Sequence, residues 1–334
     1  MSDTTLSSET SPERSPWAKI VVVVLGLCIA VSLMLLAFLT PSINSGAEDL
    51  PLGVSGPEQV TGQIGGQLDE AQPGAFEVEQ YDSAEAVTEA VQDREVLGGI
   101  SVGDDGAVTI TVASGAGTPY ASLLKGIGAG LTQAGMTVTY DDVAPLPQDD
   151  PQGLGLSALG LPLAFGGMIS AALLSTQLKR RPWHRIIGSL AASVAVGFVV
   201  VAILQFGFGS VDGNYVTTSL SLSLGMAAIS LFVLGMESLL GFAGLGIGAV
   251  LMMFIANPLS GMATGWQWLP SPWGFIGQLL PPGAAGSLLR ADAFFDGRGA
   301  GLPILVLTCW AVLGIVLVGL STLRKKPVAE TVAA

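Results

Sequence analysis

Two groups of charged side chains stand inside or beside apolar sequence, where charge is costly and usually serves a function. Glu237 is the single carboxylate of the apolar run 220–240. It could carry a proton or meet a substrate, although hydrogen bonding within a helix bundle near the membrane surface is favoured. The stretch KRRPWHR predicts a basic flank that anchors helices at the cytoplasmic surface, and docking of a partner is the sharper alternative. Its candidate residues are Lys179, Arg180, Arg181, Trp183 and Arg185.

Groups that could perform catalysis or bind a metal are scarce elsewhere. His184 is the single histidine, and Cys28 and Cys309 lie inside apolar runs, where cysteine behaves as a small hydrophobic residue. The pairs Asp104-Asp105 and Asp149-Asp150 offer oxygen ligands for calcium, but without the spacing of a calcium-binding loop. The sequence also lacks the GxxxxGK[ST] phosphate loop. We therefore expect no enzyme activity, no cofactor and no metal site.

The elements that would position these residues are long apolar runs. Half of the residues are hydrophobic, 12% are charged, and the mean hydropathy is +0.63, which is unusual for a soluble domain. A helix needs about 20 apolar residues to cross the bilayer core. The sequence therefore predicts an α-helical polytopic membrane protein. Its six expected transmembrane helices are residues 20–40, 159–178, 186–206, 220–240, 245–262 and 302–323.

An acidic segment separates the first run from the other five. Residues 41–153 hold 18 acidic and two basic residues, a net charge of about −16, so we expect no nucleic-acid partner. Strand and helix patterns alternate along this segment in the order β-α-β-α-β-β-α-β. This order predicts an inserted extracytoplasmic α/β domain.

The distribution of lysine and arginine predicts the orientation. Nine of the 13 basic residues flank the runs, near residues 14–19, 179–185 and 324–326. If all three clusters are cytoplasmic, the chain obeys the positive-inside bias. We then expect cytoplasmic tails at 1–19 and 324–334, an outer domain at 41–153 and a five-helix bundle within 154–323, all in the cell membrane. A cleaved signal peptide is disfavoured because the first run exceeds the usual 7–15 apolar residues.

The connection 266–301 between the last two runs has its own pattern. Its three tryptophans are typical of the headgroup zone. The Pro281-Pro282 pair predicts that one short helix stops there before another begins. Such a hairpin must be covered by protein or bonded internally, so we expect a re-entrant or interfacial cap on the outer end of the bundle. Its candidate outer gate is Asn257, Pro281, Pro282 and Arg290.

This layout resembles that of type-2 ABC exporter permeases, including the phage-infection-protein branch. The likeness covers nearly the whole chain, and its more specific pieces are NPLSG (257–261) and LPPGAAGSLLRADAFFDGRG (280–299). LPLAFGGMIS (161–170) is a weaker match. The resemblance implies a permease that forms a homodimer or hetero-oligomer and exports a membrane lipid, glycolipid, drug or cell-envelope component. A separate cytoplasmic ATPase would drive it through residues 179–185, a loop that is short for this role.

Two other functions fit the same topology. Half of a resistance–nodulation–division transporter also has an outer domain after the first of six spans, and Glu237 would then carry the proton. A non-transporting accessory subunit would use its acidic outer domain to recruit machinery that transports or builds envelope lipids. Glycine, alanine and serine in the spans would permit close packing with a partner. The sequence favours the permease.

Overall fold

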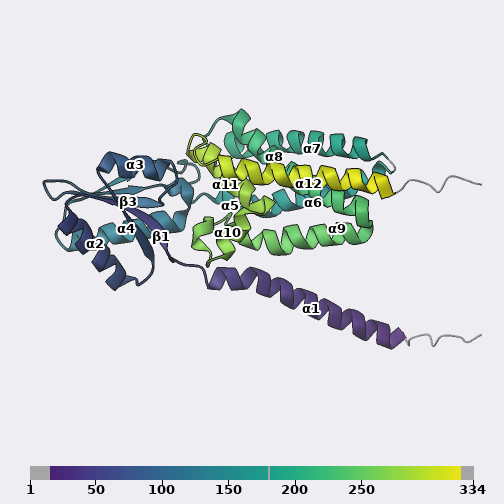
Figure 1. The fold of residues 1–334 in the computed structure, drawn as a ribbon, viewed down its shortest axis with the longest axis horizontal. Coiled ribbons are helices and arrows are strands. Elements are labelled where there is room, and N and C mark those ends of the chain that lie inside the picture. The colour runs from purple at the N-terminus through teal and green to yellow at the C-terminus, as the bar shows by residue number, and fades with distance from the viewer. Residues whose placement is uncertain (1–15, 180, 325–334) are drawn as a thin grey trace, which may run out of the picture.

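The computed structural model describes residues 16–179 and 181–324. The molecule is elongated, with an α/β domain at one end and long helices at the other (Figure 1). We call the end of the bundle nearest the α/β domain the domain end, and the opposite end the far end. Within the described residues, five helices are long and apolar enough to cross a membrane. They are α1 (Pro16–Ile43), α6 (Gly160–Gln177), α7 (Pro182–Ala202), α8 (Tyr215–Leu240) and α12 (Gly301–Arg324).

The fifth apolar run is shorter than expected. It forms α9 (Phe242–Ala249) and a π-helical continuation, η3 (Val250–Ala256). These 15 residues reach about 22 Å, less than the roughly 30 Å of a bilayer core. A 3-10 turn, η4 (Pro258–Ser260), follows, and Gly261 with a φ of 61° ends it. The expectation of six spanning helices is therefore corrected to five long helices and one short one.

Helix α8 is the centre of the bundle. It packs against α6, α7, α9, α11 and α12, and most of its residues are buried. Small residues permit this approach. A Cβ on Gly314 of α12 would lie 2.4 Å from the carbonyl carbon of Leu231, so only glycine fits there. On the side of α7, the hydroxyls of Ser189 and Ser230 form a hydrogen bond of 2.5 Å.

Helix α1 stands apart from this bundle. It runs alongside the other long helices but diverges from them toward the far end (Figure 1). Its main contacts are with η3 and η4, near its own C-terminal end. Its apolar side chains are exposed along most of its length, from Ile20 to Leu36. Such an apolar surface suits a lipid environment.

The α/β domain has the predicted element order. Its mixed sheet runs β2-β1-β3-β4-β5, with only the β3–β4 pair antiparallel. Ile100 and Ile110 face each other across that pair and are fully buried in the core of the domain. The elements are β1 (Leu50–Ser55), α2 (Glu58–Ala71), β2 (Phe76–Tyr81), α3 (Ala84–Gln92), β3 (Gly98–Val102), β4 (Val108–Val112), η1 (Ser114–Ala116), α4 (Thr118–Gln133) and β5 (Val138–Asp142).

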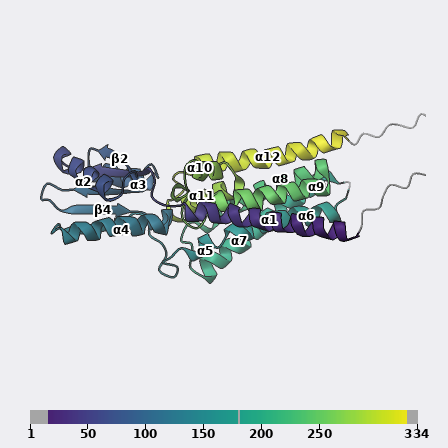
Figure 2. The same ribbon diagram turned by 90° about the horizontal axis from the view of Figure 1, so that it is seen from below.

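Short helices join the domain to the bundle. They are α5 (Leu154–Ser157), η5 (Trp266–Trp268), α10 (Trp273–Gln278) and α11 (Pro281–Phe294), and a π-helical turn, η2 (Ile203–Gly207), extends α7. As predicted, one short helix, α10, stops just before Pro281 and Pro282 and another follows. The two prolines themselves begin α11, because a proline at the first helical position gives up no hydrogen bond. Nearly every residue of α11 is buried. It lies between the long helices and the α/β domain (Figures 1 and 2).

Candidate functional site

At the far end of the bundle, two of the predicted charged residues, Arg185 and Glu237, come together in one cluster. Arg185 Nη1 lies 2.9 Å from Glu237 Oε2. Its Nε and Nη2 donate to the carbonyl oxygens of Leu178 and Ser175, both at 2.9 Å. Both side chains are mostly shielded, with 12% and 20% exposed. Arg185 therefore caps the C-terminal end of α6 and ties it to α8, and we call this group the Arg185 cluster.

The rest of the predicted loop faces outward. Lys179, Arg181 and Trp183 are exposed, and Arg180 lies outside the described residues. The connection between α6 and α7 spans only residues 178–181. Its available surface is therefore a small basic patch beside one aromatic ring.

A cleft lies between α1 and the bundle near the domain end. On one face of α1 lies a cavity of about 380 Å³, and on the other a cavity of about 420 Å³. We call the two together the α1 cleft. Each alone is within the size range of small-molecule sites, about 300–1,000 Å³.

The two halves of the cleft differ in polarity. The first is lined mainly by apolar side chains, among them Leu36, Ile255 and Trp273. The second includes the polar residues Ser42 and Asn257 beside apolar ones. An amphipathic molecule would therefore find an apolar and a mixed surface on either side of a single helix.

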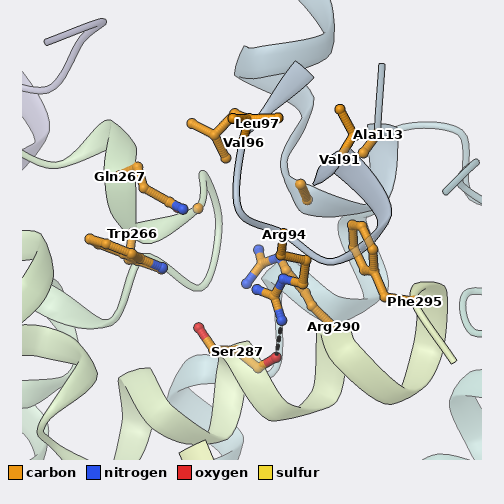
Figure 3. A pocket seen from close by; sticks show the side chains of 12 residues that line it. Val91, Arg94, Val96, Leu97, Ala113, Trp266, Gln267, Ser287, Arg290 and Phe295 are labelled. Carbon is orange, nitrogen blue, oxygen red and sulfur yellow. Dashed lines mark hydrogen bonds between the residues drawn. The ribbon is translucent and has the colours of Figure 1, made fainter. Parts of the chain in front are cut away.

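The junction between the domain and the bundle holds two arginines that lie close together, Arg94, which is partly buried, and Arg290, which is buried (Figure 3). Arg94 follows α3 with a φ of 64°, and its side chain reaches the bundle. Its Nη1 donates to the carbonyl oxygen of Ser287 at 3.1 Å, and its guanidinium carbon lies 5.2 Å from the centre of the Phe295 ring. Arg290 of α11 is 6% exposed and donates through Nη2 to the carbonyl oxygen of Met262. We call Arg94 and Arg290 the arginine pair.

Aromatic side chains lie beside the arginine pair. Phe295 belongs to a core cluster with Val87 and Val91 of the α/β domain. Tyr120, 2% exposed, donates to Gln267 Oε1 at 3.3 Å and packs edge-on against Trp268. The domain and the bundle thus share apolar cores at this junction, and Trp268 packs in one of them against Tyr120.

Burial sets the electrostatics of the junction. It lowers the pKa of Arg94 to about 10. The pKa of Arg290 also falls to about 10, through burial first and then through the positive charge of Arg94. Burial raises the pKa of Tyr120, so this phenol is neutral at physiological pH. Both guanidinium groups therefore stay charged at neutral pH.

The predicted outer gate is divided between two places. Asn257 lines the α1 cleft, while Pro281 and Pro282 lie buried about 12 Å along α11 from Arg290. Met262 connects the two places, because it lines the cleft and its carbonyl accepts from Arg290. Within the described residues, no group of three or more His, Cys, Asp or Glu side chains is arranged to hold a metal.

Sequence reasoning missed Arg94 and Tyr120. A signal for Arg94 was present, because it is one of only two basic residues in the acidic segment 41–153. Comparison of the chain with protein-family models, curated proteins and solved structures finds no match. The function is therefore argued from the geometry and from the resemblance carried by residues 257–261 and 280–299.

Proposed function

We propose that this chain is the membrane permease subunit of an exporter for an amphipathic, lipid-like component of the cell envelope. The observation that carries the proposal is the α1 cleft. An apolar cavity of about 380 Å³ and a more polar cavity of about 420 Å³ flank a single helix that is otherwise separate from the bundle. A lipid-like molecule needs both kinds of surface. A helix with few bundle contacts leaves a lateral route from the bilayer.

The positions of the two ends of the described chain support the expected orientation in the membrane. The described chain begins and ends at the far end of the bundle, opposite the α/β domain (Figure 1). The basic residues Lys179 and Arg181 are exposed on the α6–α7 connection. With this end in the cytoplasm, the acidic domain lies outside the cell membrane, as the positive-inside bias requires. A cytoplasmic ATPase would then meet the small basic patch of Lys179, Arg181 and Trp183.

The test is purification of the tagged full-length chain from its native membrane in mild detergent. Mass spectrometry of the eluate would identify co-purifying proteins and lipids, and an ATPase assay would follow. We expect a stoichiometric nucleotide-binding subunit and an enriched amphiphile. Ala37→Trp, which fills the apolar cavity, should remove the amphiphile but retain the ATPase.

A matched control is available on the same helix. Ala30 is exposed to the surroundings of α1, so Ala30→Trp adds the same ring without filling the cleft. It should leave both the ATPase and the amphiphile in the eluate. Loss of the amphiphile in both variants, or in neither, would refute the cleft as the binding place.

A second function, a non-transporting accessory subunit, is favoured by the Arg185 cluster. Arg185 is committed to α6 and α8, and the α6–α7 connection offers little surface to a motor. Co-purification of a different envelope transporter, with no ATPase subunit, would support it. The proton-driven alternative is disfavoured because Glu237, its likeliest carrier, is paired with Arg185.

A further inference from the structure

Both halves of the α1 cleft are lined without charged side chains. No Asp, Glu, Lys, Arg or His is among the described residues that line the more polar half, of about 420 Å³, or the apolar half, of about 380 Å³. A phosphate or carboxylate headgroup would enter the cleft without meeting a cation, and an ammonium headgroup would enter it without meeting a carboxylate. Because an unpaired charge is costly away from water, the cleft is matched to an uncharged ligand.

The hydroxyl groups of the polar half have already given their protons to the chain. They belong to Ser42, Ser45, Ser157, Ser260 and Thr264. Each donates to a backbone carbonyl oxygen, at 2.9, 2.8, 2.8, 2.7 and 3.1 Å respectively, and a carbonyl oxygen can only accept. What remains for a ligand is the lone pairs of the hydroxyl oxygens. A ligand that supplies hydrogen-bond donors is therefore the complement of this surface.

Asn257 adds a polar side chain to the same half. Its backbone carbonyl accepts from Ser260 at 2.7 Å, but its side-chain amide has no hydrogen bond with any residue that the structure describes. The amide both donates and accepts. An alcohol group also does both, whereas an ionised phosphate or carboxylate oxygen only accepts. The amide can therefore bind an alcohol group in either direction.

We propose that the amphiphile of the α1 cleft carries an uncharged headgroup with several hydroxyl groups, such as a sugar. This inference rests on the proposed function and narrows it to one substrate class, neutral hydroxylated lipids. The headgroup lies in the polar half, near the C-terminal end of α1 (Figure 1). There its hydroxyl groups donate to the serine and threonine oxygens and bond with Asn257. The acyl chains lie along the apolar half, against Leu36, Ile255 and Trp273.

The test compares lipids that share the same acyl chains and differ in the headgroup. They are a glucosyl diacylglycerol, its O-methylated form without hydroxyl donors, the anionic phosphatidylinositol and a cationic trimethylammonium lipid. Binding to the purified full-length chain is measured by native mass spectrometry in a polyoxyethylene detergent, because a maltoside would itself present a sugar. We expect the glucosyl lipid to bind about tenfold more tightly than each of the others. Free glucose at the same concentration should not displace it, because glucose lacks the chains that fill the apolar half.

Variants test the individual contacts. Asn257→Leu should weaken binding of the glucosyl lipid about tenfold, and Ser42→Ala about threefold. Asn257→Asp keeps acceptor oxygens, so it should retain the glucosyl lipid to within about threefold, whereas it would repel an anionic ligand. Ser32→Ala is the matched control for Ser42→Ala, because Ser32 is exposed on α1 outside the cleft. It should leave the affinity unchanged.

The outcomes separate this inference from the function on which it rests. Equal binding of the glucosyl lipid and its O-methylated form would overturn the hydroxylated headgroup. Tighter binding of a charged lipid that Ala37→Trp removes would also overturn it, yet would keep the cleft as a lipid site. Failure of every lipid to bind, or binding that Ala37→Trp leaves intact, would overturn the inference together with the cleft on which the proposed function rests.

Discussion

Replacing Arg185 by Gln should destabilise the far end of the bundle more than replacing its partner Glu237 by Gln. Arg185 makes three contacts of 2.9 Å, two to carbonyl oxygens near the end of α6 and one to Glu237. Glu237 takes part in only one of them. Its amide variant keeps an oxygen that can still accept from Arg185.

The magnitudes follow from this asymmetry. A hydrogen bond to a charged group contributes about 1.5–3 kcal/mol. Glu237→Gln weakens one such bond, so its cost is about 1–2 kcal/mol. Arg185→Gln removes all three and leaves a shielded carboxylate without its partner, which costs about 3–5 kcal/mol. Because both side chains keep some contact with water, the lower part of each range is expected.

The assay is thermal unfolding of the purified chain in detergent for the two single variants and the double variant. Arg181→Gln is the control, because this arginine is exposed on the same connection and should change stability by less than about 0.5 kcal/mol. The double variant should cost less than the sum of the single variants, because the stranded carboxylate is gone. Equal costs for the two single variants would refute the capping role of Arg185. Loss of transport in a fully stable Glu237→Gln protein would instead favour a proton carrier.

Three further predictions concern packing, capping and docking. Gly314→Ala should cost about 1–3 kcal/mol by overpacking against α8, whereas Gly319→Ala, which meets open space, should not; thermal unfolding separates them. Burial alone would raise the pKa of Asp150, but hydrogen bonds from the start of α5 outweigh it and hold the pKa below the ordinary 3.8. The folded state should therefore lose stability as the pH falls below about 3.8. Asp150→Asn should remove this acid step when unfolding is measured against pH. Phe295→Ala should cost about 3–5 kcal/mol in thermal unfolding through the shared core, while the exposed Phe275→Ala should be nearly neutral.

Local patterns were sufficient to predict most of the elements. The alternation in residues 76–81 and 108–112 reports two strands directly, because side chains on a strand alternate between two faces. The long apolar helices follow from length and hydropathy. The prediction that the fifth apolar run spans the membrane was wrong, because a hydropathy window does not register Pro258, which ends the helix early. The break at Pro281 was predicted correctly, because proline both stops one helix and can begin the next.

The site was less accessible to sequence reasoning. Arg185 and Glu237 were each singled out, but their pairing joins residues 52 positions apart and depends on how α7 packs against α8. Arg94 meets Ser287 across 193 positions. No local period encodes such a contact, because it arises only when the inserted domain docks on the bundle. The α1 cleft likewise depends on where α1 lies, which its uniform apolarity does not specify.

The separation between Arg94 and Ser287 also sets an order of events during synthesis. A ribosome adds about 5–20 residues per second, so Arg94 exists for roughly 10–40 seconds before its acceptor, 193 residues later, has been made. The last strand of the α/β domain ends at Asp142, so the domain is complete well before Ser287 is made, while Arg94 is still fully hydrated. Docking of Arg94 on α11 is consequently one of the late steps of maturation, and a chain halted before α11 would present a finished domain with nothing to dock on.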